Sequence, residues 1–255
     1  MNRVHDNSKG ELVHLAEMEV VMNYKIRISE VNKSDSKAGR ASASAKAYAT
    51  VVFGDSLVVR NIAIVEKKDG QGMFVSMPSQ RTSEVDEYNN PVYKDIVNPI
   101  TSEFQQEFSG AILEAYEQKK AGTLDKDGLV VGDGEGAPEF SVSVTPYERE
   151  GSNIRGLASI YLEDSFVINS VSIVNGRNGE FVSMPAYKAS TKAKAGESLY
   201  RDIVYPITKE FREQLHGELL NVYHEKKEQQ IKEAKENVGA QDKPKQKERE
   251  NLPFR

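Results

Sequence analysis

The sequence predicts an α+β fold in which two tandem domains each combine an antiparallel sheet with one helix. The first observation is a repeat: Phe-Val-Ser-Met-Pro occurs at 74–78 and 181–185, and Tyr-Lys-Asp-Ile-Val at 93–97 recurs as Tyr-Arg-Asp-Ile-Val at 200–204. The spacing of about 107 residues is that of a whole domain rather than of a solenoid unit. The second observation is a strand period in the front half of each copy, and the third is a helix period in the back half.

The front half of each copy has the pattern of an antiparallel meander. Apolar and polar residues alternate over 24–28 and over 140–144, which is the period of a half-buried strand. Short turns at 54–55 and 163–164 separate the next two strands in each copy, and short turns favour antiparallel neighbours. The further strands are expected at 45–53, 57–65 and 74–78 in the first copy and at 154–162, 166–174 and 181–185 in the second.

The back half of each copy predicts one amphipathic helix packed on the sheet. Pro99 and Pro206 end the extended segment, and Thr101 and Thr208 are suitable N-cap residues. Apolar side chains then recur at intervals of four residues, which places them on one helix face. They are Phe104, Phe108, Ile112 and Tyr116 in the first copy and Phe211, Leu215, Leu219 and Tyr223 in the second.

Composition and pattern divide the chain into five segments. Residues 1–17 are polar and form an N-terminal extension, 18–120 are the first domain (copy one), and 139–228 are the second (copy two). The segment 121–138 is rich in Gly and Asp, so it predicts a flexible linker that still allows the two domains to touch. The charged tail 229–255 is expected to extend the preceding helix for a few turns and then to fray.

The composition of the 255 residues excludes several protein classes. With no cysteine, the chain has no disulfide, thiol nucleophile or thiolate metal site. No apolar run approaches the ~18 residues of a membrane span, and the first residues lack the apolar core of a signal peptide. We therefore expect a soluble, cytoplasmic protein. The net charge of −5 argues against a strongly basic surface, so any phosphate binding must depend on a few clustered cations.

The sequence contains no motif that predicts an enzyme, a metal or a cofactor. Its four histidines are scattered, and it has no Ser-His-Asp arrangement and no phosphate-binding glycine loop. Asp95 and Asp202 stand beside a cation in the repeated block and could be taken for catalytic acids. The alternative that we favour is that they cap or hydrogen-bond the backbone near the start of the helix.

Polar loops of about 15 residues follow both Met-Pro blocks, and loops of this length within a compact domain are often functional. The loop of copy two contains Tyr187, Lys188, Lys192 and Lys194, a combination that could contact phosphates and stack on a base. A solvated surface loop would have the same composition. The corresponding loop of copy one is acidic, so the two copies are not expected to be equivalent; its acidic residues are Glu84, Asp86 and Glu87.

The two repeated blocks, followed by a helix that ends in Val-Tyr-His at 222–224, resemble the SpoVG family of septation regulators. The resemblance spans nearly all of both copies. It implies a small sheet-and-helix domain that forms homodimers in the cytoplasm, binds DNA or RNA, and regulates gene expression, sporulation and formation of the division septum. Family members have one domain, so the fusion predicts an intramolecular pseudo-dimer. Further association of chains through exposed sheet edges remains open.

The chain departs from the family at the basic stretch Ser-Lys-Arg that follows Met-Pro. Here the stretch is Ser-Gln-Arg at 79–81 and Ala-Tyr-Lys at 186–188. Position by position, the resemblance leaves Arg81, Lys94, Lys188 and Arg201 as phosphate contacts. The predicted nucleic-acid-binding residues are thus Arg81, Lys94, Tyr187, Lys188, Lys192, Lys194 and Arg201. The competing hypothesis is a protein-interaction module that has kept the fold and lost nucleic-acid binding.

Overall fold

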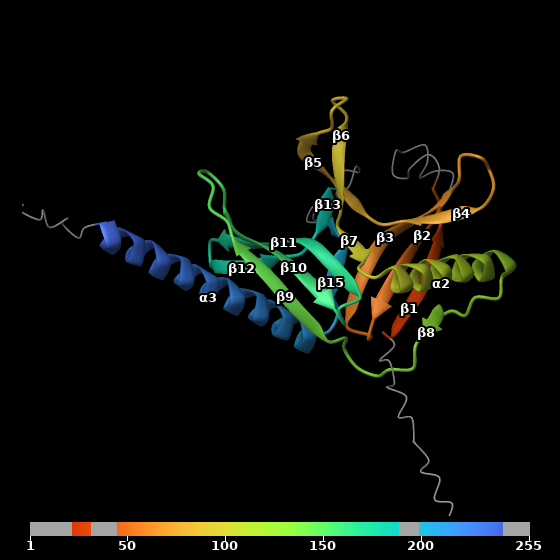
Figure 1. Cartoon of the computed structure of the whole chain (residues 1–255). Coiled ribbons are helices and arrows are strands. Elements are labelled where there is room, and N and C mark those ends of the chain that lie inside the picture. Colours follow the sequence, from red (N-terminus) through yellow and green to blue (C-terminus); the bar gives the residue numbers. More distant parts are fainter. Residues whose placement is uncertain (1–21, 32–44, 189–198, 242–255) are drawn as a thin grey trace, which may run out of the picture.

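The computed structural model describes residues 22–31, 45–188 and 199–241, and within them it is an α+β fold of antiparallel sheets and two long helices (Figure 1). The elements of copy one are β1 (Tyr24–Glu30), β2 (Ala45–Phe53), β3 (Leu57–Glu66), β4 (Met73–Ser76), β5 (Ser79–Val85), β6 (Pro91–Asp95), β7 (Val97–Pro99) and α2 (Ser102–Ala121). After β8 (Leu129–Val131), those of copy two are β9 (Phe140–Pro146), β10 (Ile154–Leu162), β11 (Phe166–Gly176), β12 (Gly179–Ser183), β13 (Ala186–Lys188), β14 (Tyr200–Asp202), β15 (Val204–Pro206) and α3 (Lys209–Gln241).

The predicted meander is confirmed in both copies. Strands β1 to β4 pair in sequence order as antiparallel neighbours, and so do β9 to β12. The turns between the second and third strands have positive φ at both central residues: 49° at Gly54 and 48° at Asp55, and 45° at Glu163 and 50° at Asp164. Positive φ at both positions matches the twist of a tight hairpin, which explains why the strands reverse here.

The copies exchange the three-residue strands that precede their helices, which no pattern in the sequence predicts. The strand β7 leaves copy one and pairs with β11, so that Val97 lies opposite Ile168. Reciprocally, β15 leaves copy two and pairs with β3, so that Val204 lies opposite Val59. Each sheet is therefore completed by the other half of the chain, and the packing is that of an intramolecular pseudo-dimer (Figure 1).

A β-bulge makes room for each exchanged strand. In β3, Arg60 and Asn61 together face one residue of β2, and Asn61 has φ 65°. The bulge directs the Arg60 amide toward the other copy, where it donates to the Ile203 carbonyl at 2.8 Å. The bulge of copy two repeats this geometry, with Ser170 at φ 63° and the Asn169 amide donating at 2.7 Å to the Ile96 carbonyl.

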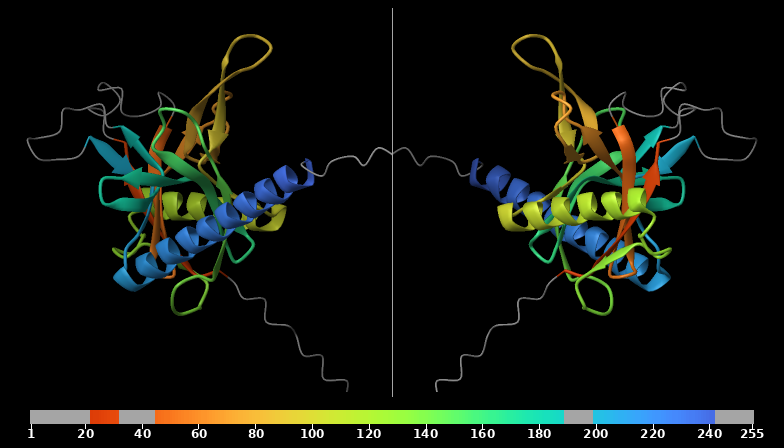
Figure 2. Two further views of the ribbon diagram at one scale, coloured as in Figure 1. Left: turned by 90° about the vertical axis from the view of Figure 1, so that its left-hand side faces the viewer. Right: turned by 90° about the vertical axis from the view of Figure 1, so that its right-hand side faces the viewer.

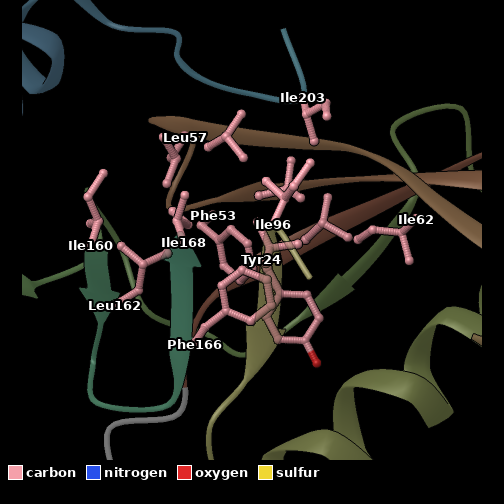
Figure 3. Close-up of a cluster of buried hydrophobic side chains, with 14 of the residues drawn as sticks. Tyr24, Phe53, Leu57, Ile62, Ile96, Ile160, Leu162, Phe166, Ile168 and Ile203 are labelled. Atoms are coloured by element: carbon pink, nitrogen blue, oxygen red, sulfur yellow. The ribbon is translucent and has the colours of Figure 1, made fainter. Parts of the chain in front are cut away.

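The buried side chains form one cluster that runs through both copies. The ring of Phe166, from β11, packs against Phe53 of copy one, with 5.1 Å between the ring centroids (Figure 3). The Phe166 centroid also lies 5.4 Å from that of Phe108 and 6.4 Å from that of Phe104. Ile96 and Ile203, which precede the exchanged strands, lie in the same cluster (Figure 3). Because the core is continuous, neither copy buries its apolar surface alone.

The helices begin where the sequence predicts. The hydroxyl of Thr101 accepts a hydrogen bond from the Phe104 amide at 3.1 Å, and Thr208 accepts one from the Phe211 amide at 3.3 Å. The predicted apolar faces are buried on the sheets. Helix α3 continues past residue 228 as far as Gln241, projecting away from the sheets (Figure 2). Among the described residues, no helix combines the length and apolar character needed to cross a bilayer.

The N-caps provide a test of helix stability. Replacing Thr101 with alanine is expected to lower the free energy of unfolding by about 1 kcal/mol, because the Phe104 amide loses its side-chain acceptor. Thr101→Ser keeps the hydroxyl and is the matched control. Urea unfolding measures both variants, and equal stabilities would show that the cap contributes nothing.

The segment 121–138 is more ordered than its composition suggests. Ala121 still belongs to α2, and β8 pairs with β1, so that Val131 lies opposite Tyr24. The side-chain amide of Asn23 also donates to the Gly134 carbonyl. A three-residue strand is too short to produce a sequence period, so the sequence did not predict this pairing within the expected linker.

Candidate nucleic-acid interface

The polar segments that follow the Met-Pro blocks, which the sequence predicts as loops, contain paired strands in both copies. We call each pair of strands a hairpin, although residues 189–198 between the strands of copy two lie outside the described residues. In copy one, β5 and β6 pair antiparallel, and in copy two β13 pairs with β14. The Asp86 carboxylate shapes the first turn by accepting hydrogen bonds from the Tyr88 amide at 2.9 Å and the Asn90 amide at 2.7 Å. These interactions also lower the pKa of Asp86. Most residues on both hairpin faces are exposed, so no alternation of apolar residues marked these strands.

Both hairpins lie on the same side of the molecule (Figures 1 and 2). Their bases are held at equivalent positions, because the Ile96 amide donates to the Pro78 carbonyl and the Ile203 amide to the Pro185 carbonyl, both at 2.8 Å. The exchanged strands follow directly. The strand exchange therefore fixes where each hairpin leaves the core.

Each hairpin places a cation beside a tyrosine on one face. Arg81 lies opposite Tyr93 in the first hairpin, and Lys188 lies opposite Tyr200 in the second. Directly paired residues on antiparallel strands project to the same side. The exposed fractions of the two tyrosines are 61% and 59%. These tyrosines are not among the site residues predicted from the sequence, although both belong to the repeated block.

The other face of each hairpin holds the second predicted cation. Lys94 lies opposite Gln80, whose amide donates to the Ser170 hydroxyl of copy two at 2.6 Å. Lys94 also forms an exposed ion pair with Glu84 at 3.3 Å. An exposed pair of this kind contributes little to stability, so a phosphate could compete for the lysine. In the second hairpin Arg201 lies opposite Tyr187.

The structure thus places five of the seven predicted site residues on two hairpins. Arg81 and Lys94 belong to the hairpin of copy one. Tyr187, Lys188 and Arg201 belong to the hairpin of copy two. The other two, Lys192 and Lys194, lie outside the described residues.

An open cleft lies beside each hairpin, between its base, the neighbouring fourth strand of the copy and the helix. The cleft of copy one has a volume of about 880 Å³ and that of copy two about 650 Å³. One pair of equivalent positions holds the same residue in both clefts, Asp95 and Asp202. Three other pairs hold different residues: Asn98/Tyr205, Gln105/Arg212 and Ser109/His216. Burial and the nearby Arg212 lower the pKa of His216, which favours its neutral form. Both clefts are open to solvent beside the hairpin, and their linings mix polar and apolar side chains.

The repeated aspartates do not cap the helices, contrary to the favoured prediction. Asp95 lies on β6 and Asp202 on β14, while Thr101 and Thr208 supply the cap hydroxyls. Partial burial raises the pKa of Asp95. Within residues 22–31, 45–188 and 199–241, no three acidic or histidine side chains are grouped so that they could hold a metal ion.

Comparison with known proteins agrees with the repeat. The SpoVG family model matches residues 21–118 and 139–225. A SpoVG protein of Treponema denticola, named for septation, is 39% identical over 75 residues, which cover 29% of this chain and 72% of the relative. A similarly named protein of Clostridioides difficile is 34% identical over 76 residues, which cover 30% of this chain and 76% of the relative. The chain therefore belongs to the SpoVG family and contains two tandem copies of its domain.

Proposed function

We propose that this protein is a regulator that binds DNA or RNA through the paired hairpins of its two copies. The observation that supports the proposal best is the recurrence of one cation–tyrosine pair, Arg81 with Tyr93 and Lys188 with Tyr200, at the same register in both hairpins. Cations bind phosphates, and exposed aromatic rings stack on unpaired bases. The pairing of these two groups favours single strands or loops over intact duplex.

The charge distribution predicts selective rather than indiscriminate binding. The net charge of −5 opposes the approach of a polyanion to most of the surface. Glu84 and Asp86 also make the outer part of the first hairpin acidic. Productive contact is then confined to the bases of the hairpins, where Arg81 and Lys188 lie. The clefts beside them provide space for an unstacked base.

The role in the cell would be regulation by occupancy, without chemistry on the bound strand. The relatives are named for septation, and we propose the same process for this protein, together with the control of sporulation that the family resemblance implies. A bound pseudo-dimer would cover a short stretch of nucleic acid and block or recruit other factors there.

Fluorescence anisotropy with short single-stranded DNA, RNA and duplex DNA across a salt series tests this proposal. Arg81→Ala with Lys188→Ala should weaken binding about tenfold, at about 0.7 kcal/mol per exposed cation. The slope of log affinity against log salt should become shallower by about 0.7 for each cation that no longer neutralises a phosphate of the single strand.

The control removes two cations outside both hairpins, Lys119 at the end of α2 and Lys126 before β8, both exposed. Lys119→Ala with Lys126→Ala changes the net charge by the same amount, so it should have little effect on affinity. Equal losses in the two double variants, or a salt-independent affinity, would contradict binding by the hairpin cations.

A protein-interaction role is the second candidate, and the tip of the first hairpin favours it. Val85 is 53% exposed and Tyr88 is 77% exposed, beside the acidic Asp86 and Glu87. Such a tip suits a partner with a basic rim around an apolar groove. A stoichiometric protein partner that no longer binds Tyr88→Ala, with no nucleic-acid binding even at low salt, would favour this role over the first.

A further inference from the structure

The two places where the copies cross are equivalent in the repeat but hold different side chains. At one crossing, Arg60 of β3 lies over the ring of Tyr205 of β15, with 4.7 Å from its guanidinium carbon to the ring centroid. At the other, Asn169 of β11 donates a long hydrogen bond of 3.5 Å to the Asn98 side chain of β7. By repeat position Arg60 corresponds to Asn169, and Asn98 corresponds to Tyr205.

Each contact joins a residue of one copy to a residue of the other. Between the two crossings, both residues of the contact are different. A cation faces an aromatic ring at the first crossing, which is a favourable arrangement. An amide faces an amide at the second, where the Asn169 oxygen also accepts from the Ser159 hydroxyl at 2.9 Å and the Asn98 amide donates to the Pro99 carbonyl at 3.1 Å. At each crossing the two facing side chains suit each other chemically, although the two crossings use different residue types.

The same surfaces would be mismatched if copies of one kind paired between two chains. Copy one paired with copy one would place Arg60 against Asn98 at both crossings. Copy two paired with copy two would place Asn169 against Tyr205 at both. Only pairing of copy one with copy two gives both matched contacts.

We infer that Arg60–Tyr205 and Asn98–Asn169 form a pairing code that directs each copy to the other copy rather than to its own kind in a second chain. The occupant of each exchanged-strand surface is therefore the opposite copy, normally that of the same chain. Specificity of this kind arises from the cost of wrong pairings as well as from the right contacts. It acts in addition to the linker, which already raises the effective concentration of the two copies.

Two double exchanges within the full-length chain test the code without changing its composition. R60N/N169R puts an amide against the Tyr205 ring and a guanidinium against Asn98, and N98Y/Y205N creates the reverse mismatches. The four substitutions together restore an amide pair at one crossing and a cation–ring pair at the other. Thr50 occupies the position of Ser159 in copy one, so a hydroxyl is available there to the new amide.

We expect each double variant to lower Tm by about 2–4 °C, a shift of the size expected in a chain of this length when both crossing contacts are weakened. R60N/N169R also gives matched contacts when copies of one kind pair between two chains. Its chain-to-chain dimers should therefore form at about tenfold lower protein concentration than those of the wild type, as measured by sedimentation velocity. The quadruple variant should regain both the wild-type Tm and the wild-type self-association.

A quadruple variant that loses as much stability as the two double variants combined would overturn the inference, and so would double variants that match the wild type in both measurements. If a double variant fails to fold, the quadruple variant still decides: wild-type stability supports the code, and failure to fold contradicts it.

Discussion

Replacing Phe166 with alanine is expected to destabilise both halves of the chain by about 3–5 kcal/mol, the usual loss for a buried phenylalanine. The Phe166 ring comes from copy two, yet its ring contacts are Phe53, Phe104 and Phe108 of copy one. Its removal leaves a cavity in the shared part of the core. A loss of this size is a large fraction of the stability of an ordinary domain.

Guanidinium unfolding followed by tyrosine fluorescence and far-UV circular dichroism measures the effect. The two probes should give one coincident transition, shifted to lower denaturant, because the core is continuous. Phe181→Ala is the matched control: this ring is 49% exposed on β12, so its loss should cost much less. Two separate transitions, with only that of copy two shifted, would show that the copies fold independently.

Removing Tyr93 or Tyr200, the tyrosines opposite Arg81 and Lys188, is expected to have the largest effect on binding. Stacking of a base on an aromatic ring contributes about 1–3 kcal/mol, so Tyr93→Ala and Tyr200→Ala should each weaken single-strand binding roughly 5- to 150-fold. The slope of affinity against salt should change little, because the cations that neutralise phosphates are still present. This distinguishes the tyrosines from the cations Arg81 and Lys188.

Tyr93→Phe with Tyr200→Phe keeps both rings and should retain most of the affinity for single strands. Anisotropy titrations with abasic and normal oligonucleotides separate stacking from backbone contact, since an abasic strand should bind wild type and the alanine variant alike. Full affinity in the double alanine variant would remove base stacking from the mechanism.

The parts of the fold that sequence predicts well are those with a strong local pattern. Strand β10 begins and ends at the predicted residues, because its buried side chains alternate along its length. The helix starts were also predictable, since Thr101 and Thr208 are threonines that follow a proline by two residues and begin an apolar stripe. Repetition strengthened each of these predictions, because two copies had to satisfy the same pattern.

The strand exchange left no comparable signal. Val97 and Val204 would be buried whether they paired within their own copy or across to the other, so their hydrophobicity cannot show the partner. The positive φ of Asn61 and Ser170 accompanies the bulge beside each exchanged strand. Neither residue type predicts a bulge from the sequence, because both occur in many backbone conformations. Topology of this kind depends on long-range pairing, which local periodicity does not encode.

The candidate site was predicted in part. Arg81 and Lys188 came from their positions after the Met-Pro blocks, while their neighbours across the strands, Tyr93 and Tyr200, became apparent only from the register. Cross-strand neighbours lie far apart in sequence and depend on where the hairpin turns. In copy one that turn is set by the Asp86 carboxylate, whose role requires the folded geometry.

Mapping the bound strand on the full-length protein tests the central claim most directly. Amide chemical shifts of isotope-labelled protein would be followed by NMR while a short single-stranded RNA is added at low salt. The account predicts that the largest shifts lie at 79–82 and 92–95 in the first hairpin and at 186–188 and 200–202 in the second, rising together in one titration. Shifts confined to α3 or to the outer face of either sheet, with both hairpins unchanged, would contradict it.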